Sequence, residues 1–311
     1  MRLLVVVTRH TDVKAVMEYV ARRYARGEVE VELLIILQEA DRAAKDSAAV
    51  VNRTLAELTE LLRKIWSVRS LNTRLVTGRP GEQIARVSQD CQASMVLLAV
   101  PHRSRLIQSF FLHRVARRLF NNYGCSVEFI RPKDSMQADP WRVTVPVPID
   151  KVDNFPLEQL QQAGCPEGSR ITLLGLLPPL IDKSSIEVNE GAILLAEHRM
   201  SGRLAKAQAQ LETLAARARE QSGERFHIDS KVTAQSLRDA VAAEASGPDL
   251  MLISSDPGRA SGLKRSSAAF LPAFPSFSAS PVLSVDCSVL LMGPARRAVE
   301  PRQGFGAAAQ G

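Results

Sequence analysis

The sequence has few aromatic residues, few cysteines and no long apolar run, which excludes several classes of protein. Aromatic residues make up 5% of the 311 residues, cysteines number four, and no apolar run reaches the about 18 residues that a membrane-spanning helix needs. No cysteine belongs to a CxxC pair or has a histidine at metal-ligand spacing. The 45% apolar content excludes global disorder, and the composition fits neither collagen nor a coiled coil. We expect a globular protein without a membrane span, in a reducing compartment such as the cytoplasm.

A net excess of positive charge is absent outside the first half of the chain. The formal net charge is +7, but residues 1–135 hold 22 basic and 14 acidic side chains, whereas residues 136–311 hold 18 and 19. Much of the excess lies in the segment between Asp90 and Glu128, which has no acidic residue. Because basic and aromatic residues do not alternate there as in a base-stacking surface, we predict no nucleic-acid partner. The segment carries Arg103, Arg105, Arg114, Arg117 and Arg118.

Apolar runs alternate with amphipathic segments along the first half. Short β-branched runs predict strands, and apolar residues spaced by threes and fours predict helices. Pro80 stands where the first turn of a helix accepts a missing N–H. The alternation predicts a parallel sheet with helices on both faces. The predicted strands are residues 3–7, 29–37, 71–76, 95–100 and 125–130, and the predicted helices lie at 12–27, 43–66, from 80 onward and at 112–119.

The second half repeats this plan after a segment with two prolines. A duplicated α/β unit is therefore predicted, with a first domain at residues 1–132, a linker at 133–141, a second domain at 142–292 and a disordered tail at 293–311. The predicted strands of the second half are residues 143–149, 171–177, 226–232, 250–254 and 281–285, and its predicted helices are 157–163, 190–221 and 236–245.

Three segments resemble characteristic stretches of the universal stress protein family. Residues 76–100 (VTGRPGEQIARVSQDCQASMVLLAV) run from a strand through a Gly and a helix-opening Pro to an apolar strand. GCSVEFIRP (124–132) and SPVLSVDC (280–287) stand where the family has its last strands. The resemblance implies two tandem five-stranded parallel-sheet domains, Rossmann-like and adenine-nucleotide-hydrolase-like. It also implies pairing through the last strands, as an intramolecular pseudo-dimer with contacts near Val127 and Val282 or as a homodimer.

Many members of this family bind ATP, which the first copy is poorly equipped to do. The family uses an acidic residue after the first strand and a G-x2-G-x9-G-(S/T) loop after the fourth, because glycines let backbone N–H groups approach phosphate oxygens. In the first copy Arg9 stands at the acidic position. Its loop reads Val100, Pro101, His102 and Arg103, then His113 and Arg114, with no glycine.

The second copy departs less from this pattern. Asp150 stands at its acidic position, and Gly258 and Gly262 follow its predicted fourth strand, one residue further apart than the pattern asks. The resemblance therefore implies degenerate nucleotide-binding motifs in both copies, with ATP the candidate ligand and no certain cofactor. The residues of the candidate anion or nucleotide cleft are Arg9, His10, Arg103, Arg114, Asp150, Gly258 and Gly262.

The sequence leaves three interpretations of function open. The arginines between 102 and 118 are either a solvated helix face or an anion site in which guanidinium groups replace backbone amides. No combination of nucleophile, base or metal ligands emerges, so we predict a non-catalytic cytoplasmic protein of stress response or regulation, with a protein partner. The alternative is a nucleotide- or anion-binding sensor, and a third interpretation is a regulator docked to a membrane transporter.

Overall fold

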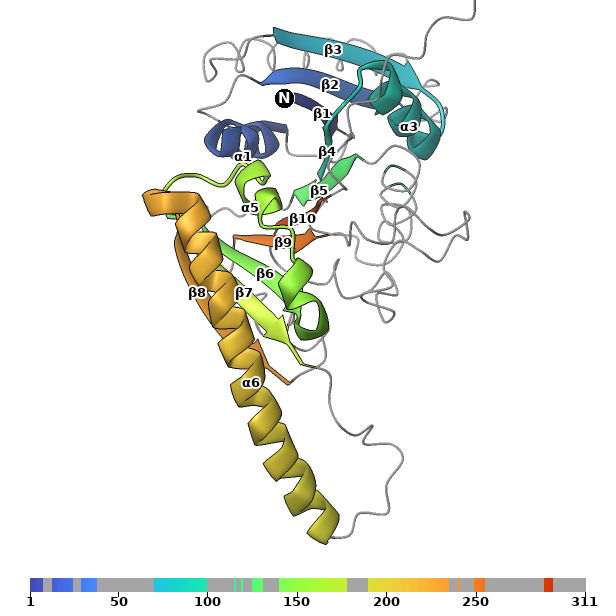
Figure 1. Cartoon of the computed structure of the whole chain (residues 1–311). Helices are drawn as coiled ribbons and strands as arrows, with labels where there is room; N and C mark the ends of the chain where they lie inside the picture. Colours follow the sequence, from blue (N-terminus) through green and yellow to red (C-terminus); the bar gives the residue numbers. More distant parts are fainter. Residues whose placement is uncertain are drawn as a thin grey trace, which may run out of the picture.

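The computed structural model describes residues 1–7, 13–24, 29–37, 70–99, 115, 119, 125–130, 140–177, 190–234, 240, 249–254 and 288–292. Within them the chain forms one mixed sheet of ten strands in the order β3-β2-β1-β4-β5-β10-β9-β6-β7-β8 (Figure 1). The predicted helices at 43–66 and 236–245 lie outside the described residues except for Ala240, and so does the tail at 293–311. The protein is thus an α/β structure, as predicted.

The first half supplies five parallel strands. Its chain order alternates with helices as predicted, and two of these, α1 (Val13–Tyr24) and α3 (Pro80–Asp90), are described. The buried residues Val115 and Leu119 are helical, which agrees with the helix predicted at 112–119. The strands are β1 (Arg2–Val7), β2 (Glu30–Leu37), β3 (Ser70–Thr77), β4 (Met95–Ala99) and β5 (Ser126–Ile130).

The turn between β3 and α3 shows how local sequence sets this topology. Gly78 has φ +128°, a conformation that side-chain-bearing residues rarely adopt, and it ends β3. Two residues later Pro80 opens α3, where its missing N–H has no helical partner to lose. The Gln83 side-chain amide donates to the Thr77 carbonyl at 3.1 Å and closes the turn.

The second half holds the remaining strands and the longest helix. Four strands run parallel in the order β9-β6-β7-β8, and β10 lies parallel to β9 on the side of the first half. Helix α6 (Glu190–Ser222) spans 33 residues, or about 50 Å at 1.5 Å per residue. The other elements are β6 (Arg142–Pro148), the 3-10 segments η2 (Ile149–Asn154) and η3 (Gly223–Arg225), α5 (Glu158–Gln162), β7 (Arg170–Leu176), β8 (His227–Thr233), β9 (Leu250–Ser254) and β10 (Ser288–Met292).

The two halves meet through their last strands. β10 pairs antiparallel with β5, and Leu290 stands opposite Glu128. Pairing near Val127 was predicted, but the partner strand is Ser288–Met292, whereas the segment around Val282 lies outside the described residues. The expectation of two five-stranded sheets is corrected in one respect. The halves share one continuous sheet, in which the second half has four strands beyond the junction strand β10.

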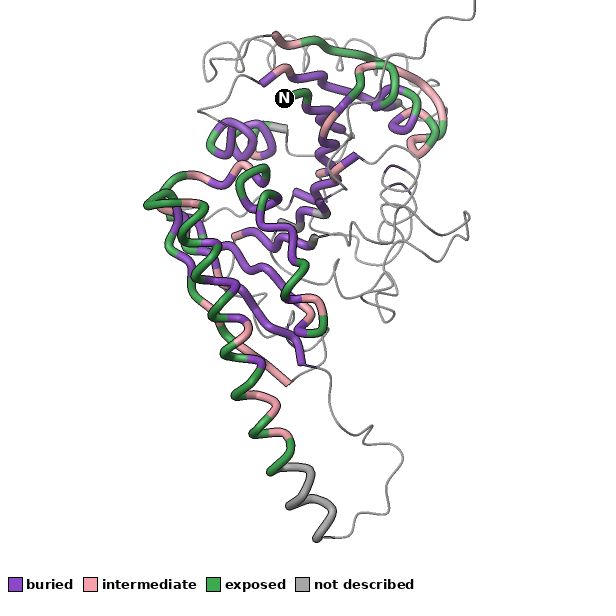
Figure 2. The backbone as a smooth tube through the Cα atoms, viewed as in Figure 1, coloured by how far each residue is buried: buried purple, intermediate pink, exposed green. Residues whose placement is uncertain are grey.

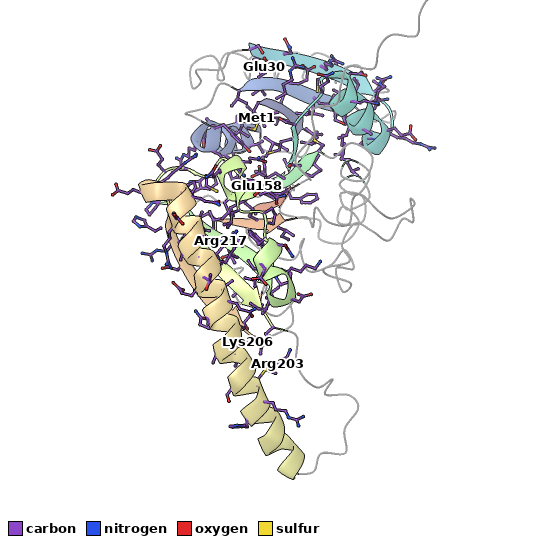
Figure 3. The ribbon with its side chains drawn as sticks, in the orientation of Figure 1. Met1, Glu30, Glu158, Arg203, Lys206 and Arg217 are labelled. Atoms are coloured by element: carbon purple, nitrogen blue, oxygen red, sulfur yellow. The ribbon has the colours of Figure 1, made fainter. Side chains whose placement is uncertain are left out.

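Buried residues follow most strands of the sheet (Figure 2), and their apolar side chains form two cores. Both cores contain residues of both halves. One includes residues of α1, α5 and α6, and the other includes residues of α3 with Val115 and Leu119. Among the side chains of α6 that are described, from His198 onward, the fully buried ones start at Ala207, and Met200 and Leu204 are partly buried against the core. Arg203 and Lys206 lie on the N-terminal part of the same helix (Figure 3). No described helix is long and apolar enough to cross a membrane.

Candidate functional site

The sheet order creates two places where ligands bind in open α/β folds. Such sites lie at the carboxyl ends of adjacent strands whose connections leave in opposite directions. In the first half this point falls between β1 and β4, which end at Val7 and Ala99. The predicted residues Arg9, His10, Arg103 and Arg114 follow these ends in sequence, and all four lie outside the described residues.

The corresponding point of the second half falls between β6 and β9. Their paired residues are Val143 with Leu250 and Thr144 with Met251, and the pairing goes no further along β6. Pro146 follows and has no N–H to donate to a ladder. Beyond Thr144, the residues of β6 therefore run toward the carboxyl edge without pairing with the described residues of β9.

Asp150 leaves this edge as an exposed carboxylate. It is the second residue of η2, which directly follows β6. Gly258 and Gly262, predicted to face it, follow β9 in sequence and lie outside the described residues. An exposed carboxylate at this position can accept hydrogen bonds from hydroxyl or amine groups of a ligand.

The packing of η2 fixes where Asp150 points. Its neighbours Ile149 and Val152 are buried and so is Phe155, the residue after η2. Ile149 sits on β7 at Gly175, where an added Cβ would lie 2.8 Å from Ile149 Cδ1 and 3.0 Å from Leu211 Cδ2. With the apolar side chains of η2 directed inward, Asp150 is left on the solvent side.

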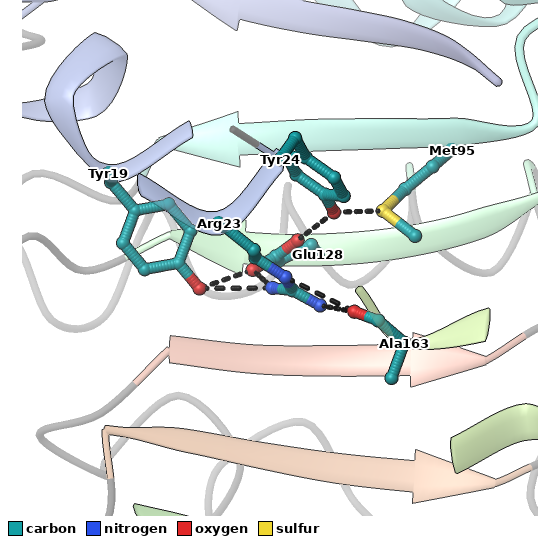
Figure 4. A network of polar contacts seen from close by, with 6 residues as sticks. All are labelled: Tyr19, Arg23, Tyr24, Met95, Glu128 and Ala163. Atoms are coloured by element: carbon teal, nitrogen blue, oxygen red, sulfur yellow. Dashed lines mark hydrogen bonds and ion pairs between the residues drawn. The ribbon is translucent and has the colours of Figure 1, made fainter. Parts of the chain in front are cut away.

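The most concentrated polar group of the described residues is buried between the halves (Figure 4). Arg23 of α1 and Glu128 of β5 form an ion pair in which both side chains are fully inaccessible. The Tyr19 hydroxyl donates to Glu128 Oε1 at 2.5 Å, and Arg23 Nη1 also lies 3.1 Å from that hydroxyl. The Tyr24 hydroxyl lies 3.4 Å from Glu128 Oε2 and 3.0 Å from Met95 Sδ.

Arg23 also binds the second half directly. Its Nε donates to the carbonyl of Ala163 at 3.2 Å, and Nη2 donates to the same oxygen. Ala163 is the residue after α5, so this arginine fastens the end of that helix. Close packing supports the contact, because a Cβ at Gly164 would lie 2.8 Å from Tyr24 Cε1, and Trp141 and Tyr19 have ring centroids 5.4 Å apart.

Burial shifts the ionisation of these groups. Burial alone would lower the pKa of the Arg23 guanidinium, but its electrostatic interactions with Tyr24, Tyr19 and Cys165 and its hydrogen bond with Tyr19 raise that pKa. Burial raises the pKa of the Tyr24 phenol, although the Arg23 charge acts in the opposite direction. Burial likewise raises the pKa of the Cys165 thiol. Arg23 therefore stays charged and the two acids stay protonated at neutral pH.

A family model described as the Universal stress protein family matches residues 1–131. No curated protein matches.

Solved structures share the fold over 94% of the chain. They include a functionally unknown protein of Pseudomonas aeruginosa (16% identity, 92% of that chain, TM-score 0.56) and a universal stress protein of Archaeoglobus fulgidus (13%, 96%, TM-score 0.55). The cytoplasmic domain of a prokaryotic cation chloride cotransporter is also similar (10%, 95%, TM-score 0.50). At such identities the structural likeness speaks for the fold alone. Residues 1–131 of this chain are therefore similar to the universal stress protein family.

Proposed function

We propose that this chain is a non-catalytic cytoplasmic protein of the stress response, in which two universal-stress-like copies act as one fixed regulatory unit. The observation that carries the proposal is the junction. A continuous sheet and the hydrogen bonds from the buried Arg23 to the Ala163 carbonyl link the two copies. Separating the copies would remove the hydrogen bonds between the Arg23 guanidinium and the Ala163 carbonyl, so separation is opposed by more than lost apolar contact. A fixed unit of this kind suits a protein that presents a surface to a protein partner.

The sequence of the first copy supports a role without phosphate chemistry. Where the family places phosphate-binding glycines, this chain has Pro101, Arg103 and Arg114. Proline lacks an amide donor, and side-chain guanidinium groups replace the backbone cradle. We expect no release of phosphate from MgATP above the rate without protein. A turnover that disappears in Asp150→Asn but persists in Asp153→Asn, an exposed neighbour in η2, would contradict the non-catalytic role.

A second candidate function is sensing of a nucleotide or anion by the second copy. The specific observation in its favour is the exposed Asp150 at an edge where the β6–β9 pairing stops at Thr144. In a sensor of this type the carboxylate takes ligand hydroxyl groups, and backbone amides near Gly258 and Gly262 take phosphate.

Calorimetric titration with ATP, with and without Mg²⁺, separates the two functions. A sensor gives saturable heat that is lost in Asp150→Asn and kept in Asp153→Asn if the second copy binds. If the first copy binds through its arginines, Arg114→Ala loses the heat instead. No heat and no thermal shift at millimolar ATP leave the fixed regulatory unit as the function and remove nucleotide sensing.

A further inference from the structure

The ten-stranded sheet has two outer edges, and they are built differently. Among the described strands, β3 and β8 each have a neighbour on one side only, whereas β5 and β10 occupy each other's edges inside the chain. An edge strand presents unpaired backbone N–H and C=O groups and invites another strand unless it is blocked. Because β5 already pairs with β10 of the same chain, β3 and β8 are the described edges at which a strand of another chain can join.

The β8 edge is blocked by side chains of α6. The His227 amide bonds the Ser169 carbonyl on the side of β7, so the next residue, Ile228, directs its carbonyl outward. Arg219 Nε donates to that carbonyl at 2.8 Å. Glu212 holds Arg219 at 2.9 Å and also accepts from the Ser230 hydroxyl at 2.5 Å.

The β3 edge has no such protection among the described residues. Its four central residues, Asn72 to Leu75, are exposed, as Figure 2 shows along the outermost strand. Leu75 is 43% exposed, an unusual state for a large apolar residue in this structure. The one charged side chain of β3, Arg74, turns toward its own chain, with Nε 2.6 Å from Glu32 Oε1 and Nη1 3.5 Å from Asp90 Oδ2. The positive charge of Arg74 is therefore compensated within its own chain by Glu32 and Asp90.

We propose that two copies of this chain associate by antiparallel pairing of their β3 strands about Thr73. In that register Leu71 of each copy stands opposite Leu75 of the other, on the same face of the joined sheet. Arg74 stands opposite Asn72, so no charge directly faces a like charge. The arrangement repeats at the outer edge the antiparallel joint that β5 and β10 make inside the chain.

Complementarity of sequence selects a second copy as the occupant. The pattern Leu71, Thr73, Leu75 is symmetric about its centre, so each copy offers what the other needs. β8 has a comparable symmetry about Ser230, where Asp229 would face Lys231, but its outward carbonyl is already taken by Arg219. The contact between two short strands is smaller than the about 1,200 Å² of stable complexes, so the dimer forms reversibly with concentration.

Sedimentation equilibrium of the full chain from about 1 µM to about 1 mM measures this association. We expect a monomer–dimer equilibrium for the natural chain. Leu75→Lys should raise the dissociation constant at least about tenfold, because two cross-strand leucine pairs are lost together and a lysine blocks the edge. Circular dichroism and the melting temperature show that the variant is folded. An unchanged dissociation constant in folded Leu75→Lys refutes the proposal.

Cysteine cross-linking tests the register independently. In Thr73→Cys the two introduced thiols face each other across the joint, where opposite Cβ atoms lie about 5 Å apart, so mild oxidation should give a covalent dimer. Asn72→Cys should not link to itself but should link when mixed with Arg74→Cys. The natural chain gives the background from its own cysteines. Ser230→Cys is the matched variant at the β8 edge, and linkage there with none at Thr73→Cys, or linkage at neither, overturns the proposal.

Discussion

Replacing Arg23 with Met should destabilise the junction between the two halves. The substitution removes the counter-charge of Glu128, which has no exposed surface, and the donor to the Ala163 carbonyl. Breaking a buried ion pair at one end costs about 3–5 kcal/mol, because the remaining charge stays desolvated. The Tyr19 and Tyr24 hydroxyls still face the carboxylate, so we expect the lower part of this range.

Urea unfolding followed by tryptophan fluorescence measures this cost at the junction itself. The chain has two tryptophans, and in a Trp66→Phe background the signal comes from Trp141, which is buried beside Tyr19. With a slope of about 3 kcal/mol per molar urea, a loss of 3 kcal/mol lowers the midpoint by about 1 M. The control is Arg22→Met at the exposed neighbouring position, which should cost less than about 1 kcal/mol.

The double variant Arg23→Met with Glu128→Leu distinguishes a lost ion pair from lost packing. Two apolar side chains leave no buried charge, so much of the stability should return. The reasoning is refuted if Arg23→Met lowers the free energy of unfolding by less than about 1 kcal/mol. It is also refuted if the double variant is as unstable as the sum of the two single variants.

Three further predictions concern the second half and its junction with the first. Gly175→Ala should cost about 1–3 kcal/mol in urea unfolding, because its Cβ would lie 2.8 Å from Ile149 and 3.1 Å from Val232, whereas Gly202→Ala, with no atom within 4 Å, should not destabilise. Stability should fall as the pH rises above about 8.5, since the folded state keeps Cys165 protonated where the unfolded chain has lost the proton, and Cys165→Ala should reduce this slope. In Arg23→Met, hydrogen exchange of residues 149–163 should quicken while that of β3 stays unchanged, and equal change in both would contradict a local role of the Ala163 contact.

Most strands of each half could be predicted because they are uninterrupted apolar runs. β1 and β4 are apolar runs buried on both faces of a parallel sheet, and such runs are distinctive in sequence. The turn from Gly78 to Pro80 could also be predicted, because glycine and proline are typical of such a turn. The last strand could not be predicted, because SPVLSVDC and SVLLM are adjacent runs of similar character. What selects Ser288–Met292 is pairing with β5 on one side and β9 on the other, a constraint that no local pattern contains.

The site was less predictable than the fold. Asp150 could be placed at the end of its strand from sequence alone, and it does leave the carboxyl edge as an exposed residue. The buried pair was missed because Arg23 and Glu128 are 105 residues apart in the sequence, and only the folding of the first half brings α1 against β5. One signal did exist: a single acidic residue in the middle of the strand Ser126–Ile130, where an ionised group is tolerated only with a partner.

The junction and the exposed carboxylate belong to one short stretch of the second half. Asp150 lies near the start of η2, and the carbonyl that Arg23 binds lies at the end of α5. Between them Val152, Phe155 and Leu160 are buried in one core that contains residues of both halves. A ligand that displaces η2 would thus disturb the core in which Leu160 of α5 is also buried. The arrangement that fixes the two copies is therefore the same one that orients Asp150, which ties any ligand effect at this edge to the stability of the junction.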